Sequence, residues 1–431
     1  MTMHHQGQET APLTFPQLSM FQALRDDMGA MSTIEVSYRI DGPLDVAAFI
    51  ESVGEVIRSH DALRLAVCEC GGSEPHQWVR ATPPLGELVT CQKVKASSEE
   101  RFSRYVVALA TKDAAEAWDP RTELPFRLRL LQYSPGVHAF IATFSQLAVD
   151  GSVRAVFGRE LWRAYRRRRG DHDAAAEPTL QFMTLAAGRD HAPIEAGATA
   201  DFWRRQFARL PQDRDFLTST TPETAEAGIT EKDFVLEGER LHSMRTTARS
   251  NNATELIWIQ HALASTVFDH TDADSLALWI PVDTRSIRER RLLGMLTLSL
   301  PLVVDRGATS PELVRALTDD WLAVLKHRRV TREIAGASGA AGLGKLVGGP
   351  ERAVRIAYVG HPQQTVRTPL NDLVLSYGAY APSRERAVAG VHLKVGSWTD
   401  RVEFHLTFNR ARITDAAAQE MTADIERLLV G

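Results

Sequence analysis

This chain of 431 residues has few cysteines, no long hydrophobic run and no large excess of one charge sign. Three cysteines, Cys68, Cys70 and Cys91, are too few for a disulfide framework and are typical of a reducing cytoplasm. No apolar run reaches about 18 residues and no basic start precedes an apolar stretch, so we expect neither a membrane partner nor export. The net charge of −4 leaves no single-sign field, so we expect no nucleic-acid partner.

What the chain does have is 44% hydrophobic residues and a length typical of about two to three domains. Helical and strand-like periodicities alternate in a mixed order, and no repeat of about 20–50 residues occurs. Helices are predicted at 44–59, 152–165, 253–268, 311–327 and 415–429, with strands near 63–70, 127–133, 138–144, 276–282, 297–304, 371–377, 390–397 and 402–408. The pattern predicts an α+β fold of two similar lobes, 1–170 and 201–431, joined by a charged, alanine-rich linker at 171–200.

The most informative segment is residues 145–151, Ser-Gln-Leu-Ala-Val-Asp-Gly, which stands between the predicted strand at 138–144 and the predicted helix from Ser152. Asp-Gly after a strand is by itself only a turn signal. Other segments in a characteristic order accompany it: Pro12 to Met20, Ile57 to Arg64, Trp118 to Leu130, Asp201 to Phe207, Pro281 to Arg285 and Gly294 to Leu302.

Together these segments resemble, over residues 12–430, the condensation domains of nonribosomal peptide synthesis, whose central motif is His-His-x-x-x-Asp-Gly. Here Ser145 and Gln146 stand in place of the two histidines, while Asp150 and Gly151 are kept. In its missing histidines and single-domain length, the chain also resembles the lincosamide-type condensing enzymes. The resemblance implies two chloramphenicol-acetyltransferase-like lobes in a V around a central tunnel.

The resemblance also implies partners and a structural ion pair. The partners are an acyl or peptidyl carrier protein, whose phosphopantetheine arm carries the thioester, and a small-molecule amine, with no permanently bound cofactor. Asp150 is implied to pair with Arg285, a contact that is costly to break, so we interpret Asp150 as architecture rather than as a proton carrier. His60 has no second ligand at metal spacing, so we expect no metal and a helix-end histidine satisfied by backbone.

Arginines cluster at the end of the helix that follows the motif. Arg163, Arg166 and Arg167 are candidates for gripping an acidic carrier protein or the pantetheine phosphate, because arginine suits bidentate contacts to anions. Cations at a helix C-terminus are equally explained by the helix dipole. Both interpretations stay open.

The missing histidine leaves the reaction without an evident base, because Gln146 can donate a hydrogen bond but cannot take a proton. One hypothesis is that the site, Ser145 and Gln146, only positions the reactants. The other is a thiol route: a five-residue loop at 71–75 would place Cys70 opposite His76 and Cys68 opposite Trp78, which gives a cysteine–histidine pair that could accept an acyl group. The alternative for the cysteines is simple core packing.

Three functions remain open from the sequence. The first is a free-standing amide-forming acyltransferase that joins a carrier-bound acyl or aminoacyl thioester to a soluble amine in antibiotic or other specialised-metabolite biosynthesis. The second is a catalytically silent domain that recruits a carrier protein and a tailoring oxygenase. The third is an ester-forming acyltransferase. We expect an enzyme rather than a recruiter, because no carrier or adenylation domain is expected beyond Gly431 and recruiters are useful when tethered.

Overall fold

The structure, a computed structural model, divides into two compact units that do not follow the chain linearly. It describes residues 9–25, 33–69, 74–171, 180–189, 196–210, 228–306, 310–337, 354–360, 367–370, 372–380 and 390–431. The first unit comprises Met1–Ala192, Arg285–Thr297 and Gln363–Arg384; the second comprises Pro193–Thr284, Leu298–Pro362 and Glu385–Gly431. Two segments that the linear division assigns to the second lobe therefore belong to the first unit, because they pack into its sheet and core.

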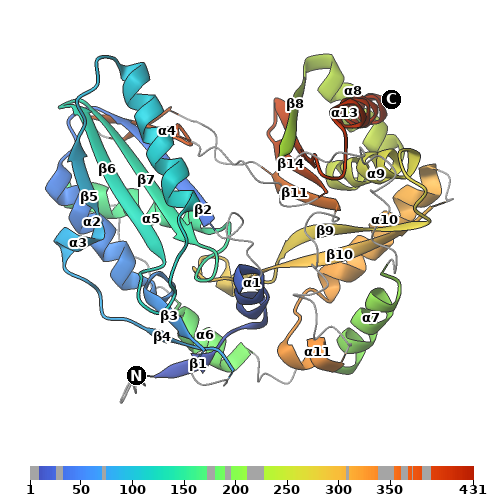
Figure 1. Ribbon diagram of the computed structural model, residues 1–431, viewed down its shortest axis with the longest axis horizontal. Coiled ribbons are helices and arrows are strands. Elements are labelled where there is room, and N and C mark those ends of the chain that lie inside the picture. Colours follow the sequence, from blue (N-terminus) through green and yellow to red (C-terminus); the bar gives the residue numbers. More distant parts are fainter. Residues whose placement is uncertain are drawn as a thin grey trace. The chain divides into compact units, whose positions relative to one another are not determined.

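A six-stranded sheet with helices on both faces forms the first unit (Figure 1). Its order is β12 (Arg367–Leu370), β13 (Leu373–Tyr377), β2 (Thr33–Asp41), β7 (Val137–Ser145), β6 (Phe126–Ser134) and β5 (Thr90–Lys93). The predicted strand at 371–377 thus crosses to this sheet, where Val374 pairs with Asp41. The predicted strands at 127–133 and 138–144 are the antiparallel pair β6 and β7.

Strand β7 lies between two layers of side chains, which explains its nearly continuous hydrophobic sequence. Phe140 and Phe144 face the core shared with α2 (Val46–Ser59) and α5 (Val153–Arg168). Ala139 and Ile141 face the opposite core, under α4 (Glu99–Ala115). Because side chains alternate along a strand, β7 holds both cores together and carries the motif at its C-terminal end.

A smaller sheet completes the first unit, with the order β1 (Thr10–Pro12), β4 (His76–Val79) and β3 (Leu65–Cys68). Three further helices accompany it: α1 (Phe15–Arg25), α3 (Leu85–Leu88) and α6 (Phe182–Arg189). Helix α6 lies inside the predicted linker at 171–200. Phe182, Met183 and Ala186 of this helix pack into the main core of the first unit.

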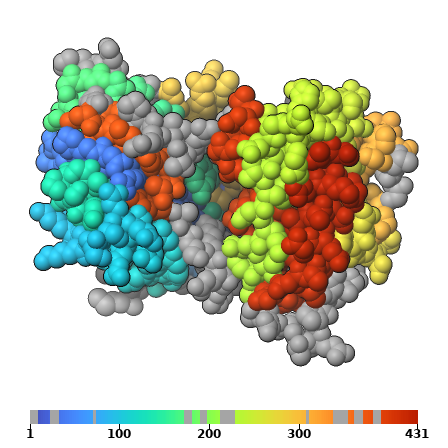
Figure 2. Space-filling model, turned by 90° about the horizontal axis from the view of Figure 1, so that it is seen from above, coloured from blue at the N-terminus to red at the C-terminus, as the bar shows by residue number. Residues whose placement is uncertain are grey.

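The second unit is also an α+β layer structure. Its sheet has the order β10 (Thr297–Asp305), β9 (Ser275–Asp283), β11 (Val354–Gly360), β14 (Val391–Ser397), β15 (Arg401–Asn409) and β8 (Ile229–Glu237). Its helices are α7 (Ala196–Ala208), α8 (Gly238–Ser250), α9 (Glu255–Asp269), α10 (Ser310–Lys326), α11 (Arg332–Ala337) and α13 (Asp415–Val430). Helices α8 and α13 lie side by side on one face of this unit (Figure 2).

The two-lobed α+β fold class predicted from the sequence is confirmed. The tunnel between the lobes stays a prediction. Among the residues that the structure describes, no helix has the length and apolar character needed to cross a membrane. Within the same residues, no group of three potential metal ligands comes together.

Helix α6 is held in place by Asp61, in the turn that follows α2. The Asp61 carboxylate accepts hydrogen bonds from the backbone N–H groups of Phe182 and Met183, both at 2.7 Å. Gln181 adds two hydrogen bonds between the same segments. Its side chain accepts from the Asp61 N–H at 3.1 Å and donates to the Ser59 carbonyl at 3.0 Å. Asp61 therefore caps the first turn of α6 from a distant part of the chain.

We expect Asp61→Ala to lower the free energy of unfolding by about 1–3 kcal/mol, because it leaves two helix N–H groups without their acceptor in a buried place. Thermal unfolding measures the change. Asp201→Ala is the matched control, because Asp201 is exposed and pairs only with the exposed Arg204 among the described residues. Equal melting temperatures for wild type and Asp61→Ala would contradict the capping role.

Candidate active site around Ser145 and Asp150

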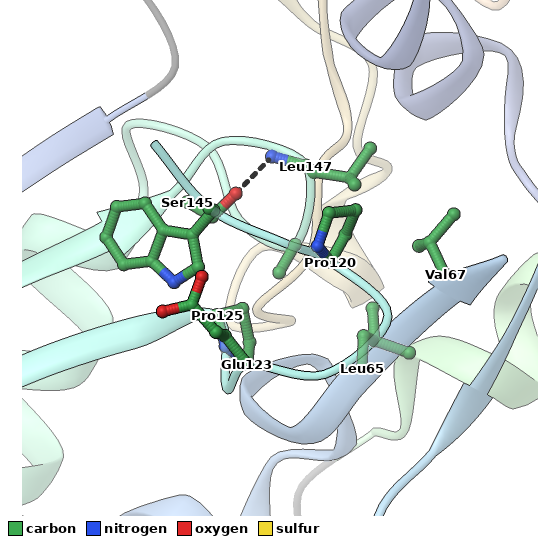
Figure 3. Close-up of a pocket in the computed structure, with 9 residues that line it drawn as sticks. Leu65, Val67, Pro120, Glu123, Pro125, Ser145 and Leu147 are labelled. Atoms are coloured by element: carbon green, nitrogen blue, oxygen red, sulfur yellow. Dashed lines mark hydrogen bonds between the residues drawn. The ribbon is translucent and has the colours of Figure 1, made fainter. Parts of the chain in front are cut away.

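The motif forms a tight turn between the end of β7 and the start of α5. Ser145 ends the strand, and its N–H donates to the Pro125 carbonyl at 3.0 Å. The Ser145 carbonyl then accepts from Ala148 and Val149 at 3.1 and 3.2 Å. Its hydroxyl oxygen accepts from the Leu147 N–H at 3.4 Å, the dashed contact in Figure 3. The turn is therefore fixed by backbone contacts and does not depend on a side chain at position 146.

Asp150 anchors this turn to another segment of the same unit. The Arg285 guanidinium holds its carboxylate in a bidentate pair, with Nη1–Oδ2 at 2.7 Å and Nη2–Oδ1 at 3.0 Å. The Leu296 N–H and the Thr297 hydroxyl also donate to Oδ2, at 2.9 and 3.0 Å. Ser152 donates to Oδ1 through its N–H at 3.1 Å and through its hydroxyl at 2.7 Å. The carboxylate is thus saturated with donors, since its two oxygens offer about four acceptor sites.

Electrostatics agree with this anchoring role. Burial alone would raise the pKa of Asp150, but the Arg285 charge and the hydrogen bonds from Arg285, Ser152 and Leu296 together hold that pKa below its usual value. The side chains are almost fully buried, at 2% exposure for Arg285 and 3% for Asp150. An ionised carboxylate without a spare acceptor position is poorly suited to shuttle protons.

Arg285 in turn fixes the segment 285–297 against the motif. Its Nε donates to the Leu292 carbonyl at 3.1 Å and its Nη2 to the Gly294 carbonyl at 2.9 Å. Gly294 has no room for a side chain, because an added Cβ would lie 2.1 Å from the Phe182 ring. A series of buried contacts therefore runs from Asp150 through Arg285, Gly294 and Phe182 to Asp61, which caps α6.

A small recess opens beside Ser145 (Figure 3). Its walls are mostly apolar: Leu65, Val67, Trp118, Pro120, Glu123, Pro125, Ser145, Leu147 and Ala148. The Glu123 carboxylate accepts from the Asp119 N–H at 2.7 Å and from Arg127 at 3.4 Å. The recess has room for roughly one water molecule.

Gln146 lies on the turn, half-buried, and outside this recess. Within the described part of the chain its amide makes no hydrogen bond. An unengaged amide offers both a donor and an acceptor to a ligand. It could therefore orient an amine or donate to a developing oxyanion, but it cannot remove a proton.

Sequence reasoning did not find a carboxylate that shares this face of the sheet. In the β2–β7 register Thr33 lies opposite Ser145, and Glu35 lies opposite Thr143. The Thr33 hydroxyl donates to Glu35 at 2.8 Å, and Arg154 in the first turn of α5 lies 4.0 Å from the same carboxylate. Alternating polar residues in β2 were the available signal, but which strand they face depends on register.

The comparisons with known proteins agree with this geometry. The sequence profile of the Condensation domain family matches residues 7–334. The chain belongs to the condensation-domain family.

The relatives of this condensation-domain protein are much longer proteins, of which it spans only a small part. It is 25% identical over 338 residues to the probable non-canonical nonribosomal peptide synthetase CymA of Salinispora arenicola, covering 75% of this chain and 4% of that protein. It is also 25% identical over 336 residues to a subunit of the linear gramicidin synthase of Brevibacillus parabrevis, covering 74% of this chain and 4% of that protein.

Two solved structures share the fold over nearly the whole chain. The X-domain from teicoplanin biosynthesis matches with a TM-score of 0.79 at 18% identity, covering 100% of this chain and 96% of that one. SgcC5 from Streptomyces globisporus matches with a TM-score of 0.73 at 18% identity, covering 97% of each chain.

The geometry of the cysteines differs from the thiol hypothesis. Cys68, not Cys70, lies opposite His76, and Ala66 lies opposite Trp78. The predicted register is thus wrong by two residues, because the connection between β3 and β4 is longer than five residues. Cys68 is buried in a small cluster with Ala66 and Trp78, and Cys70 lies outside the described residues. This packing is what the core-packing alternative for the cysteines predicts.

The arginines at the end of α5 have partners of their own. Arg167 and Arg168 both contact Glu55 of α2, and Arg166 contacts Asp171. The anion-grip interpretation is therefore weakened for Arg166 and Arg167, because their charges serve intramolecular ion pairs. His60, at the end of α2, contacts the Glu160 carboxylate through Nε2 at 2.5 Å, whereas the sequence predicted a backbone partner.

Proposed function

We propose that this condensation-domain protein is an acyltransferase that joins a carrier-bound acyl or aminoacyl thioester to a soluble amine. The observation that carries the proposal is the motif turn itself. Its anchor, Asp150 with Arg285, is complete, while the position of the family's second histidine holds the unengaged amide of Gln146. Condensation domains act on carrier-bound thioesters, so an intact turn with an available amide supports a site that still binds the reacting groups.

In the proposed reaction the amine nitrogen attacks the thioester carbonyl carbon, and a C–N bond forms. The tetrahedral intermediate then breaks its C–S bond, and the carrier's pantetheine sulfur leaves as a thiolate. The proton lost by the amine neutralises that thiolate, so no residue has to hold it. Gln146 orients the amine or donates to the oxyanion, and the fixed turn at Ser145 holds it there.

Orientation alone can supply much of the needed acceleration. Holding two reactants in a productive geometry can remove roughly 7–11 kcal/mol from a barrier, and a thioester is already an activated acyl donor. A condensing site can therefore work without a histidine base if the acceptor arrives as the free amine. This favours acceptors whose amine is not fully protonated at neutral pH.

A recruitment domain is the second candidate, and one observation favours it. The teicoplanin X-domain has also been solved as a complex with OxyB, and that structure matches this chain with a TM-score of 0.78 at 18% identity. A protein with this fold can thus act by binding another protein. For this chain, a similar role would need no base at position 146.

Reconstitution separates the two proposals. We expect purified protein, a thioester-loaded carrier protein and a panel of amines and alcohols to give free amide, because the turn and its anchor are intact. The loss of loaded carrier and the appearance of product are followed by mass spectrometry. Stable binding of the carrier or of an oxygenase, with no product from any acceptor, would favour recruitment; ester products would favour the ester-forming acyltransferase.

A further inference from the structure

Strand β2 carries a carboxylate on the same face of the first unit's sheet as the motif serine. Strand β2 lies beside β7 (Figure 1), and in their register Thr33 lies opposite Ser145 while Glu35 lies opposite Thr143. Because side chains alternate along a strand, Thr33 and Glu35 share the face that carries Thr143 and Ser145. The Cβ atoms of diagonal neighbours are at most about 7–8 Å apart, so Glu35 lies within the length of a small substrate from Ser145.

Arg154, in the first turn of α5, gives a second and independent link between Glu35 and the motif. Its Nη1 atom lies 3.8 Å from the position that a Cβ on Gly151 would take, and its Nη2 atom lies 4.0 Å from Glu35 Oε2. One guanidinium group therefore spans the distance between the motif glycine and the Glu35 carboxylate. A separation of 4.0 Å is too long for a hydrogen bond, so Arg154 does not occupy an acceptor position on Oε2.

The Glu35 carboxylate is sheltered from solvent and held in one orientation. Its side chain is 13% exposed, and Thr33, Thr143 and Ser145 on the same face are all buried. The Thr33 hydroxyl donates to Glu35 Oε1 at 2.8 Å, which fixes the direction of the carboxylate. In such surroundings the attraction between a carboxylate and a cation is stronger than in bulk water. An oriented carboxylate among hydroxyl groups therefore suits a small cationic ligand.

The proposed reaction consumes a free amine, and this requirement gives the carboxylate a role. An aliphatic amine is mostly an ammonium ion at neutral pH and cannot attack a carbonyl carbon in that form. Gln146 cannot remove the extra proton, because an amide does not act as a base near neutral pH. A carboxylate can bind an ammonium group through a charge-assisted hydrogen bond and can accept a proton from it.

We propose that Glu35 receives the acceptor as an aliphatic ammonium ion, binds it, and takes up one of its protons to give the free amine. This rests on the proposed function, which supplies the thioester. An ammonium ion loses two protons when it becomes an amide. The first passes from the nitrogen to the Glu35 carboxylate and then to solvent, and the second neutralises the leaving pantetheine thiolate as the C–N bond forms and the C–S bond breaks. Glu35 thereby acts as the base that position 146 lacks.

Two acceptors and three variants test this role. Benzylamine is an ammonium ion at about pH 7, whereas aniline is neutral there, and both react with the same thioester-loaded carrier protein. Glu35→Gln keeps the size of the side chain and removes its charge, and Glu35→Asp keeps the charge. Glu99→Gln is the matched control, because Glu99 is 53% exposed and pairs with Arg39 of the same strand at 2.8 Å. Equal melting temperatures of the variants and wild type check that each protein folds.

We expect Glu35→Gln to lower kcat/KM for benzylamine by about 10²-fold or more and for aniline by less than about threefold, because only the ammonium acceptor needs the base. The loss for benzylamine should shrink as the pH is raised to about 9, where more of the amine is free. Glu35→Asp should keep part of the benzylamine rate, and Glu99→Gln should keep all of it. Equal losses for the two acceptors, a wild-type benzylamine rate in Glu35→Gln, or a similar loss in Glu99→Gln would overturn the proposal.

Calorimetric titration with benzylamine, in the absence of a thioester, separates this role from the proposed reaction. We expect wild type to bind benzylamine at about pH 7 and Glu35→Gln to bind it at least about tenfold more weakly, since the variant lacks the counter-charge. If wild type makes no amide but shows this Glu35-dependent binding, the proposed reaction fails and the amine-binding role of Glu35 stands. If wild type neither binds benzylamine nor converts it, the role of Glu35 is wrong.

Discussion

Asp150→Ala is expected to lower the free energy of unfolding by about 3–5 kcal/mol, because it leaves the buried Arg285 guanidinium without its counter-charge. The loss also removes the acceptor for Leu296, Thr297 and Ser152, so the motif turn and the segment 285–297 separate together. Chemical denaturation with two probes measures the change. Asp119→Ala is the control, because the Asp119 carboxylate lies in an exposed turn and accepts hydrogen bonds from the neighbouring Arg121 and Thr122.

A double variant distinguishes the unpaired charge from a lost structural contact. Replacing both partners, as in Asp150→Leu with Arg285→Met, is expected to recover much of the stability, since a buried ion pair is often exchangeable for apolar residues of similar volume. If Asp150→Ala melts like the wild type while activity disappears, then Asp150 takes part in chemistry and the anchoring role is wrong.

The ion pair between Asp150 and Arg285 makes the free energy of unfolding depend on pH. The pKa of Asp150 is lower in the folded protein than in the unfolded chain, so its stabilisation is fully present above about pH 4 and is lost as pH falls through the folded value. Acid unfolding of the wild type should therefore include a contribution below about pH 4 that Asp150→Asn lacks.

Gln146→Ala is expected to lower kcat by about 10²–10³-fold if the amide donates to the oxyanion or orients the amine, with little change in the melting temperature because its amide makes no hydrogen bond among the described residues. Gln146→Glu keeps the size of the side chain but removes its donor, and is expected to lose a similar factor. The rate should also lack the step near pH 6.5 that a histidine base would produce, because glutamine does not titrate.

The thiol route predicts that activity depends on the cysteine and histidine and less on Gln146. The variants Cys68→Ala and His76→Ala test it. We expect both variants to keep the wild-type rate, since Cys68 is buried in an apolar cluster with Ala66 and Trp78. Intact-protein mass spectrometry after incubation with loaded carrier and no amine is expected to show no added acyl group. An acylated protein whose label disappears in a cysteine variant, with Gln146→Ala still active, would restore the thiol route and contradict the positioning mechanism.

The sequence by itself determined the family, the α+β class and most of the helices and strands. These features depend on local information: helical periodicity over 253–268, the strand pair around Ser134 to Val137, and the order of short motifs along the chain. The sequence also predicted the contact between Asp150 and Arg285, because the family resemblance implies both partners. In the structure the Arg285 Nη1 and Asp150 Oδ2 atoms lie 2.7 Å apart.

Only the tertiary structure decided the features that depend on register and on distant packing. Periodicity gives the face of a strand but not its offset, so the partner of His76 moved from Cys70 to Cys68, and Glu35 was found opposite Thr143 only through the sheet. The predicted linker contained a helix because Asp61, far away in sequence, caps it. Exposure is equally non-local: Ile287 is 79% exposed although Arg285, Leu292 and Leu293 of the same segment are buried, a difference that no sequence spacing records.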